Sequence, residues 1–132
     1  MPSDKAARIG LIEWTDITVA DAEQLRDFYS AVVGWKWDDV SMGDYSDYAM
    51  KASEEAMSPV AGICHAKGGN SHLPPQWLVY INVDNIDHSR QECVRLGGKL
   101  LSDVKVMPEY GKFCVIEDPA GAVAALFEPI DE

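Results

Sequence analysis

The stretch that decides the fold is Ile12 to Trp37, IEWTDITVADAEQLRDFYSAVVGWKW. Its first part alternates apolar side chains with polar or aromatic ones, at the two-residue period of a half-buried β-strand. The alternating residues are Trp14, Asp16 and Thr18 on one face and Ile17 and Val19 on the other. The sequence therefore predicts a strand with one apolar face at the start of this stretch.

An α-helix is predicted directly after this strand. Asp21 is a good N-cap, and Gln24 three residues later completes a capping-box pattern. Apolar residues then recur at the spacing of one helix face. They are Leu25, Phe28, Tyr29, Val32 and Val33. Gly34 supplies a left-handed stop, so the stretch predicts one continuous strand–helix unit.

The same strand–helix pattern returns in the second half of the chain. A strand is predicted from Trp77 to Val83 and a helix from Ile86 to about Leu96. An ungapped offset of 64 residues, the difference between Gly34 and Gly98, places the second pattern on the first. We therefore interpret the chain as one module used twice. Few of the paired residues are identical, so coincidence stays the alternative.

The composition is that of one globular domain. The chain has 132 residues, 47% hydrophobic and 25% charged, which is enough for a real core and does not suggest disorder. Met1 to Gly10 lacks the apolar segment of a signal peptide, and no apolar run approaches membrane-spanning length. Cys64, Cys93 and Cys114 lack metal-ligand spacing and fit small buried thiols of a reducing compartment. We therefore expect a cytoplasmic location.

Acidic residues outnumber basic ones by 22 to 11, which gives a formal net charge of −11. A negative field of this size repels phosphate backbones and anionic membrane surfaces, so we expect neither nucleic acid nor a membrane as a partner. Solubility is a sufficient explanation for the charge. The alternative is that the field concentrates a cationic ligand near the surface.

Turn signals divide the rest of the chain into further strands. A single domain of residues 1–132 is predicted to contain a first module at 10–66 and a second at 76–129. Residues 1–10 form a polar lead-in, and Lys67 to Pro75 form a Gly/Pro-rich connector. Each module is predicted to be β-α-β-β-β. The later strands are predicted around Trp35–Val40, Tyr48–Met50 and Val60–Cys64, and around Lys99–Val104, Lys112–Glu117 and Ala122–Phe127.

Short motifs accompany this order of elements. They are Val19-Ala20-Asp21, Phe28-Tyr29, Gly34-Trp35, Val83-Asp84, Leu96-Gly97-Gly98 and Asp118-Pro119-Ala120-Gly121. Over residues 10–129 the chain resembles the glyoxalase/bleomycin resistance/dioxygenase superfamily, also called vicinal oxygen chelate. The resemblance implies an α+β fold of two pseudo-symmetric β-α-β-β-β modules, whose mixed sheet forms a cup around a cleft. It also implies a homodimer.

The superfamily includes isomerases, lyases, ring-cleaving dioxygenases and antibiotic-sequestering proteins, so the fold does not define the reaction. In members that resemble glyoxalase I, four side chains in the cup hold a divalent ion. The resemblance places these four positions at Trp14, Leu78, Ala125 and on or near Gly62. None of these side chains can donate to a hard or borderline cation, so no metal cofactor is expected.

An alternative metal site has little support. Of the three histidines, His72 lies in the connector and His88 begins an exposed helix, while only His65 lies near a strand end that faces the cup. His65 with Cys64 would be a poor site, because a divalent ion needs more donors than these two. A loop histidine that contacts solvent is the alternative.

An apolar and aromatic wall is predicted where the metal would lie. Period-two alternation directs one set of side chains into the cup. The predicted ligand-binding residues are Trp14, Asp16, Leu78, Tyr80, Asn82, Ala125 and Phe127, with Tyr110 in a loop at the border. Such a wall with a few polar groups is typical of small-molecule sites. The alternative is that Trp14 and Phe127 fill the cup as core, while Trp35, Trp37 and Trp77 are packing residues or dimer contacts.

Catalytic motifs are sparse. The chain has no nucleophile elbow, phosphate-binding loop or dinucleotide fingerprint. Asp16 is a weak candidate for a general base, if Trp14 and Leu78 desolvate it, and a structural aspartate is the alternative. Two functions stay open. One is a binding protein for a small planar, neutral or cationic molecule. The other is a lyase, isomerase or dioxygenase-type enzyme of the superfamily.

Overall fold

The computed structural model describes residues 5–130, and the chain divides into two compact units. The central unit consists of residues 14–77. The terminal unit consists of the described residues before and after it, 5–13 and 78–130. Both units contain helices and strands, so the predicted α+β class is confirmed. Within residues 5–130, no helix is long and apolar enough to cross a membrane.

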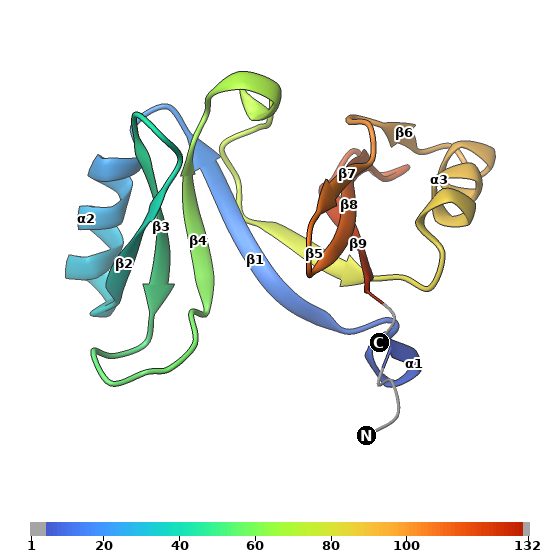
Figure 1. The fold of residues 1–132 in the computed structure, drawn as a ribbon. Helices are drawn as coiled ribbons and strands as arrows, with labels where there is room; N and C mark the ends of the chain where they lie inside the picture. Colours follow the sequence, from blue (N-terminus) through green and yellow to red (C-terminus); the bar gives the residue numbers. More distant parts are fainter. Residues whose placement is uncertain (1–4, 131–132) are drawn as a thin grey trace. The chain divides into compact units, whose positions relative to one another are not determined.

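The central unit has the predicted β-α-β-β-β order (Figure 1). Its elements are β1 (Ile12–Val19), which enters the unit at Trp14, α2 (Ala22–Val33), β2 (Lys36–Ser41), β3 (Ser46–Lys51) and β4 (Ala61–His65). The strands lie in the order β2-β3-β4-β1. β3 is antiparallel to both of its neighbours, and β4 is parallel to β1. The connector to the next strand contains one short 3-10 helix, η1 (Gly68–Asn70).

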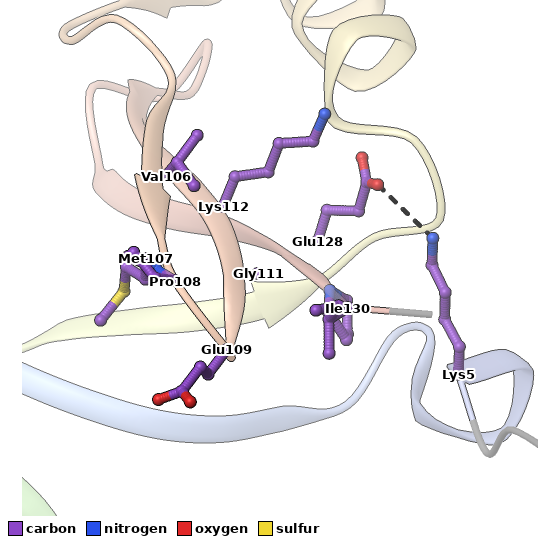
Figure 2. A pocket seen from close by; sticks show the side chains of 10 residues that line it. Lys5, Val106, Met107, Pro108, Glu109, Gly111, Lys112, Glu128 and Ile130 are labelled. Atoms are coloured by element: carbon purple, nitrogen blue, oxygen red, sulfur yellow. Dashed lines mark hydrogen bonds and ion pairs between the residues drawn. The ribbon is translucent and has the colours of Figure 1, made fainter. Parts of the chain in front are cut away.

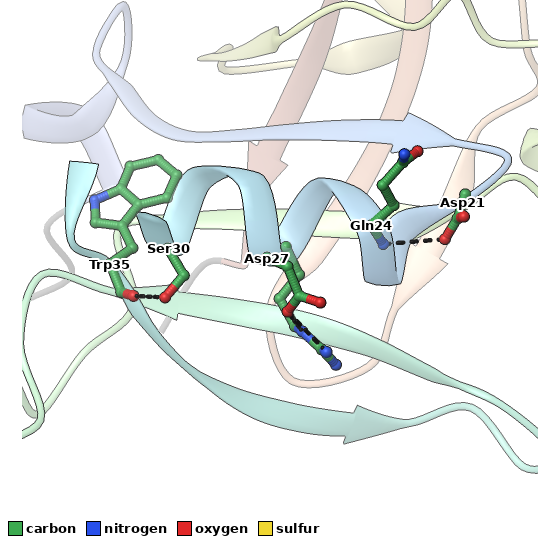
Figure 3. A network of polar contacts seen from close by, with 6 residues as sticks. Asp21, Gln24, Asp27, Ser30 and Trp35 are labelled. Carbon is green, nitrogen blue, oxygen red and sulfur yellow. Dashed lines mark hydrogen bonds and ion pairs between the residues drawn. The ribbon is translucent and has the colours of Figure 1, made fainter. Parts of the chain in front are cut away.

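Local side-chain contacts define both ends of α2 (Figure 3). The carboxylate of Asp21 accepts a hydrogen bond of 3.0 Å from the backbone N–H of Gln24, as the capping pattern predicts. Gly34 ends the helix with φ of 81°, and its N–H donates to the carbonyl of Ser30. The hydroxyl of Ser30 in turn donates to the carbonyl of Trp35 at 2.9 Å. The chain is thereby directed from the helix into β2.

The core of the central unit lies between α2 and one face of its strands. It is built on Ile17, Ala22, Tyr48, Met50 and Ile63, with Val19, Leu25, Tyr29, Trp35, Trp37 and Trp77 packed against it. The three tryptophans named last are therefore packing residues. The indole N–H of Trp77, for instance, donates to the hydroxyl of Tyr29 at 3.0 Å. The apolar stripe of α2 is only partly buried, because Phe28 and Val32 keep more than half of their surface exposed.

The terminal unit repeats this order with additions. Its elements are α1 (Lys5–Arg8), β5 (Leu78–Asn82), α3 (Ile86–Arg95), β6 (Lys99–Leu100), β7 (Lys105–Met107), β8 (Gly111–Glu117) and β9 (Val123–Pro129). β5 is parallel to β9, and β9 is antiparallel to β8. β6 and β7 both pair with the outer edge of β8. The turn between β8 and β9 forms as predicted, and Asp118 Oδ1 accepts from the N–H groups of Ala120 and Ala122.

Within the predicted polar lead-in, residues 5–8 form the helical turn α1, which the sequence pattern did not predict, and the Lys5 ammonium lies 3.5 Å from Glu128 Oε2. Residues 1–4 lie outside the described chain. The strand predicted at 99–104 is wrong beyond Leu100, because β6 ends there and β7 begins only at Lys105. The cause is Ser102, whose hydroxyl accepts the hydrogen bond from the N–H of Val115 that a continuous backbone ladder would otherwise accept.

The glycine equivalence at the helix ends also needs correction. Asn85 caps α3 as Asp21 caps α2, which agrees with the predicted offset. At the other end the left-handed residue is Gly97, with φ of 98°, and not Gly98. A β-carbon on Gly98 would lie 2.6 Å from Cys93 Sγ and 2.9 Å from the Glu117 carbonyl oxygen. Gly98 is therefore required for close packing, while Gly97 provides the turn.

The core of the terminal unit lies between α3 and the face of β8 and β9 that it covers. It contains Ile86, Cys114 and Leu126, with Val83, Val104 and Ile116 packed against them. Because neighbouring residues on a strand point to opposite faces, the residues between these core positions lie on the other face. In each unit, one face of the strands is thus covered by the unit's own helix.

Candidate functional site

In the central unit, the strand face away from α2 carries two of the predicted ligand-binding residues. Ile17 pairs with Ile63 in the core, so the adjacent pair of Asp16 and Gly62 lies on the opposite face. Trp14 lies two residues before Asp16 on the same face. The structure therefore brings Trp14 and Asp16 together, as the alternation predicted.

Two contacts fix the position of the Trp14 indole on this face. Its N–H donates to Asp16 Oδ2 at 3.3 Å. A β-carbon added to Gly62 would lie 3.1 Å from Cζ2 of the indole and 3.2 Å from Cβ of Asp16. Distances in this range are tighter than nine in ten real β-carbon contacts. One hydrogen bond thus orients the indole, which packs against the backbone of Gly62 because glycine has no side chain to obstruct it.

A thiol and a second carboxylate continue the same face. Cys64 pairs with Thr18, and Asp47 contributes to its environment from β3. Burial raises the pKa of the Cys64 thiol, and the negative charges of Asp16 and Asp47 raise it further. Cys64 is consequently a neutral thiol and a poor nucleophile. The Asp47 carboxylate also accepts a hydrogen bond of 2.8 Å from the backbone N–H of His65.

The His65 ring is a packing group. It lies edge-on to Tyr45, with 5.6 Å between the ring centroids, and 6.0 Å from the ring of Tyr48. The His65 ring, which the sequence offered as a possible metal ligand, therefore packs against two tyrosine rings. Within residues 5–130, no group of three or more His, Cys, Asp or Glu side chains is arranged to hold a metal ion.

In the terminal unit, the strand face away from α3 carries most of the other predicted residues. Tyr80 pairs with Ala125 and Asn82 pairs with Phe127, so these four side chains share one face. Phe113 pairs with Phe127 from the other side, and its ring centroid is 6.0 Å from that of Tyr80. Phe113 was not predicted as part of this face. Its position in the period-two pattern of Lys112 to Glu117 is the signal that could have identified it.

The accessible part of this face is smaller than predicted. Leu78 and Ala125 are exposed by 1% and 0%, so they offer almost no surface to a ligand. Asn82 is exposed by 3%, and its amide nitrogen donates to the Arg8 carbonyl at 3.1 Å and to Glu13 Oε1 at 2.7 Å. Both amide hydrogens are therefore used within the protein.

The remaining members of the set differ in exposure. Tyr80 and Phe127 are half-buried. Tyr110 lies in the turn between β7 and β8 and is 66% exposed.

The Asn82 hydrogen bond lowers the pKa of Glu13, as does the ion pair with Arg8. The polar contacts around Asn82 thus act as a structural network at the start of β1.

The family's metal does not fit these residues. The strand registers support the equivalence of the implied positions, because Gly62 pairs with Asp16 in one unit as Ala125 pairs with Tyr80 in the other. The indole of Trp14 fills the space where a side chain at position 62 would project. Hydrogen, methyl, isobutyl and indole groups supply none of the N, O or S donors that a divalent ion requires.

Sequence reasoning missed two features of the central face. One is the dependence of the Trp14 position on Gly62, for which an isolated glycine inside a strand was the available signal. The other is the placement of the Cys64 thiol between the charges of Asp16 and Asp47. Asp47 lies just before the strand predicted around Tyr48–Met50, so the pattern gave no reason to direct its side chain toward this face.

Comparison with known proteins places the chain in a family. Residues 14–127 match the profile of the glyoxalase-like domain. CFP32 of Mycobacterium bovis, provisionally named a glyoxylase, is 29% identical over 130 residues, which are 97% of this chain and 49% of that protein. The anthracycline biosynthesis protein DnrV of Streptomyces peucetius is 25% identical over 89% of this chain and 46% of its own length. The chain thus spans about half the length of these curated relatives.

The fold is also found among solved structures. The Mn(II)-bound glyoxalase from Novosphingobium aromaticivorans matches with a TM-score of 0.57 and 18% identity, over 92% of this chain and 39% of that one. At this level of identity the match supports the fold alone. It agrees with the fold that the sequence motifs predicted.

Proposed function

The chain belongs to the glyoxalase-like domain family, and we propose that it binds a small planar, neutral or cationic molecule against Trp14 without a metal ion. The observation that carries this proposal is the seating of the Trp14 indole on Gly62, at a position where metal-using members have a ligand. With an indole at this position, the site offers an aromatic surface instead of a metal ligand. Contact with such a surface contributes roughly 0.5–2 kcal/mol beyond apolar burial for stacking or cation–π geometry.

The charge of the surroundings supports a preference for cations. Asp16 accepts the indole N–H, and Asp47 lies close enough to contribute to the raised pKa of Cys64 on the same face. The whole chain has a formal net charge of −11. Both the local carboxylates and the overall field attract a cation and repel an anion. An acidic thiol conjugate is therefore a poor ligand for this face.

One relative supports the planar part of the proposal. The name of DnrV assigns it to the biosynthesis of anthracyclines, which are flat polycyclic aromatic compounds. A ligand of this shape presents a broad face to an indole. Burying about 150 Å² of apolar ligand surface would contribute roughly 4 kcal/mol before the entropic cost of association is subtracted. Micromolar affinity is consistent with this sum.

The alternative is an enzyme of lyase or isomerase type, and the provisional name of CFP32 favours it. Such an enzyme would use the carboxylate of Asp16 as a general base or recruit a metal through its substrate. The two functions differ in a measurable way. A binding protein retains ligand affinity without turning over thiol-conjugate substrates, with or without added Mn²⁺ or Zn²⁺.

The test is a thermal-shift screen of planar cationic, neutral and acidic compounds, followed by calorimetry on the hits. We expect planar cations to bind the wild type and to lose about tenfold or more in affinity for Trp14→Ala, because the stacking surface is removed. Trp14→Phe should retain part of the affinity. Phe28→Ala is the matched control, because Phe28 is an aromatic residue on α2 and 54% exposed. Exclusive binding of acidic compounds, or equal affinity for Trp14→Ala, would contradict the proposal.

A further inference from the structure

A cavity of about 330 Å³ lies entirely within the terminal unit, at the edge where β7, β8 and the end of β9 meet (Figure 2). Three of its lining residues form a row across neighbouring strands. Val106 pairs with Lys112, and Lys112 pairs with Glu128, so all three side chains project from the same face. This face is the one that α3 covers further along the strands, because Cys114 and Leu126 lie on it.

The charge of Glu128 is already compensated. Its Oε1 accepts a hydrogen bond of 2.9 Å from the backbone N–H of Ile86 in the first turn of α3. Its Oε2 lies 3.5 Å from the ammonium of Lys5. The dashed line in Figure 2 marks this ion pair. The carboxylate is therefore stabilised by the start of a helix and by a lysine on α1.

The charge of Lys112, unlike that of Glu128, is not paired with another described residue. Although it lies directly opposite Glu128 in the register, it forms no ion pair with any of residues 5–130. Glu109, the other carboxylate of the cavity lining, extends away from Lys5, Lys112 and Glu128 in Figure 2. Among residues 5–130, the Lys112 ammonium therefore has no carboxylate that compensates its charge. In a chain of net charge −11, this is a local exception.

Most of the rest of the lining is apolar. Val106 and Ile130 are exposed by 72% and 44%, whereas Met107, exposed by 40%, projects from the other face of β7 and Pro129 is buried. Apolar side chains beside an ammonium that pairs with no carboxylate of residues 5–130 match a ligand with a hydrophobic body and one negative charge. The volume is within the range of small-molecule sites.

We propose that this cavity binds a small amphipathic carboxylate, with the carboxylate on Lys112 and the apolar body against Val106 and Ile130. A carboxylate here forms a charge-assisted hydrogen bond with an ammonium that has no ion-pair partner in the part of the chain that the structure describes. The proposed site differs from the Trp14 face in location and in charge preference. Its success or failure is therefore independent of the function proposed above.

The experiment uses octanoate, octanamide and octylammonium as probes of one shape and three head groups. Affinities are measured by calorimetry, and the position of binding by backbone amide chemical shifts. We expect octanoate to bind and the other two to bind about tenfold more weakly, because only the carboxylate pairs with Lys112. Lys112→Met should weaken octanoate by about tenfold, and Lys112→Arg should retain most of the affinity.

Two further variants locate the site. Lys105→Met is the matched control, because Lys105 is an exposed lysine that pairs with Phe113 and projects from the opposite face. It should leave octanoate affinity unchanged. Val106→Glu places a carboxylate opposite Lys112 at a position that is 72% exposed, so it should block octanoate without unfolding the chain. Equal binding of octanamide and octanoate, unchanged affinity in Lys112→Met, or loss of octanoate in Trp14→Ala would overturn the proposal.

Discussion

The two units build similar strands and different surfaces. In the central unit, the last strand has Gly62 where the Trp14 indole needs space. In the terminal unit, the equivalent Ala125 is fully buried and the equivalent of Trp14 is the buried Leu78. The pairing of the first strand with the last is the same in both units. A repeated backbone therefore does not preserve the chemistry of its face, because that chemistry depends on a few side chains that can change together.

The two helix ends make the comparison sharpest. Gly98→Ala should destabilise the fold by roughly 2–3 kcal/mol or more, because its β-carbon would overlap Cys93 and the backbone of Glu117. Gly34→Ala should cost only about 1 kcal/mol, because it strains a left-handed φ in open space. Denaturant unfolding of both variants measures the difference. Gly97→Ala should behave like Gly34→Ala, and equal costs at positions 34 and 98 would contradict the assigned roles.

The second prediction concerns the packing of the Trp14 indole against Gly62. Gly62→Ala should cost about 1–2 kcal/mol in the wild type, because the new methyl group displaces Trp14. In a Trp14→Ala background the same change should cost at least about 1 kcal/mol less. A double-mutant cycle of unfolding free energies gives this coupling. Additive effects would show that the indole does not depend on Gly62.

The third prediction uses a turn of the terminal unit that the central unit lacks. Glu109 has φ of 74° and follows Pro108, and the N–H of Tyr110 donates to the Met107 carbonyl at 3.0 Å. This is the arrangement of a type II turn, whose third residue favours glycine. Glu109→Gly should therefore raise the unfolding free energy by roughly 0.5–1 kcal/mol. Glu109→Ala removes the carboxylate and keeps the strain, so a similar gain in both variants would contradict the explanation.

The smallest expected effect is a pH dependence at the start of β1. The Asn82 hydrogen bond lowers the folded-state pKa of Glu13 below its ordinary 4.5, with Arg8 contributing. The charged carboxylate therefore stabilises the fold above this pH, and the contribution is lost as the pH falls through the lowered pKa. Glu13→Gln should cost a few tenths of a kcal/mol at pH 7 and progressively less below about pH 4.5.

Thermal unfolding between pH 3 and pH 7 measures this difference. Glu54→Gln is the control, because Glu54 is an exposed carboxylate of the loop between β3 and β4. If the cost of Glu13→Gln stays constant across this pH range, the effect does not come from ionisation of Glu13 and the prediction is wrong. No counterpart is expected at the equivalent residue, Trp77, which directly precedes β5, because its side chain does not ionise in this pH range.

Local patterns in the sequence determined the order of the elements and the two strand faces. The alternation around Trp14, the caps at Asp21 and Asn85 and the turn at Asp118 depend on neighbours a few residues away, so they can be inferred without long-range contacts. The absence of donor side chains at the implied metal positions is likewise a property of the residues themselves.

Contacts between distant residues could be decided only by the tertiary structure. The division of residues 99–107 depends on a hydrogen bond between Ser102 and Val115, and the separate roles of Gly97 and Gly98 depend on how Glu117 approaches the end of α3. The hydrogen bond of Asn82 to Arg8, and the lack of an ion pair for Lys112 among residues 5–130, depend on contacts of the same kind. Alternation specifies the face to which a side chain points, but packing decides which partner it meets there.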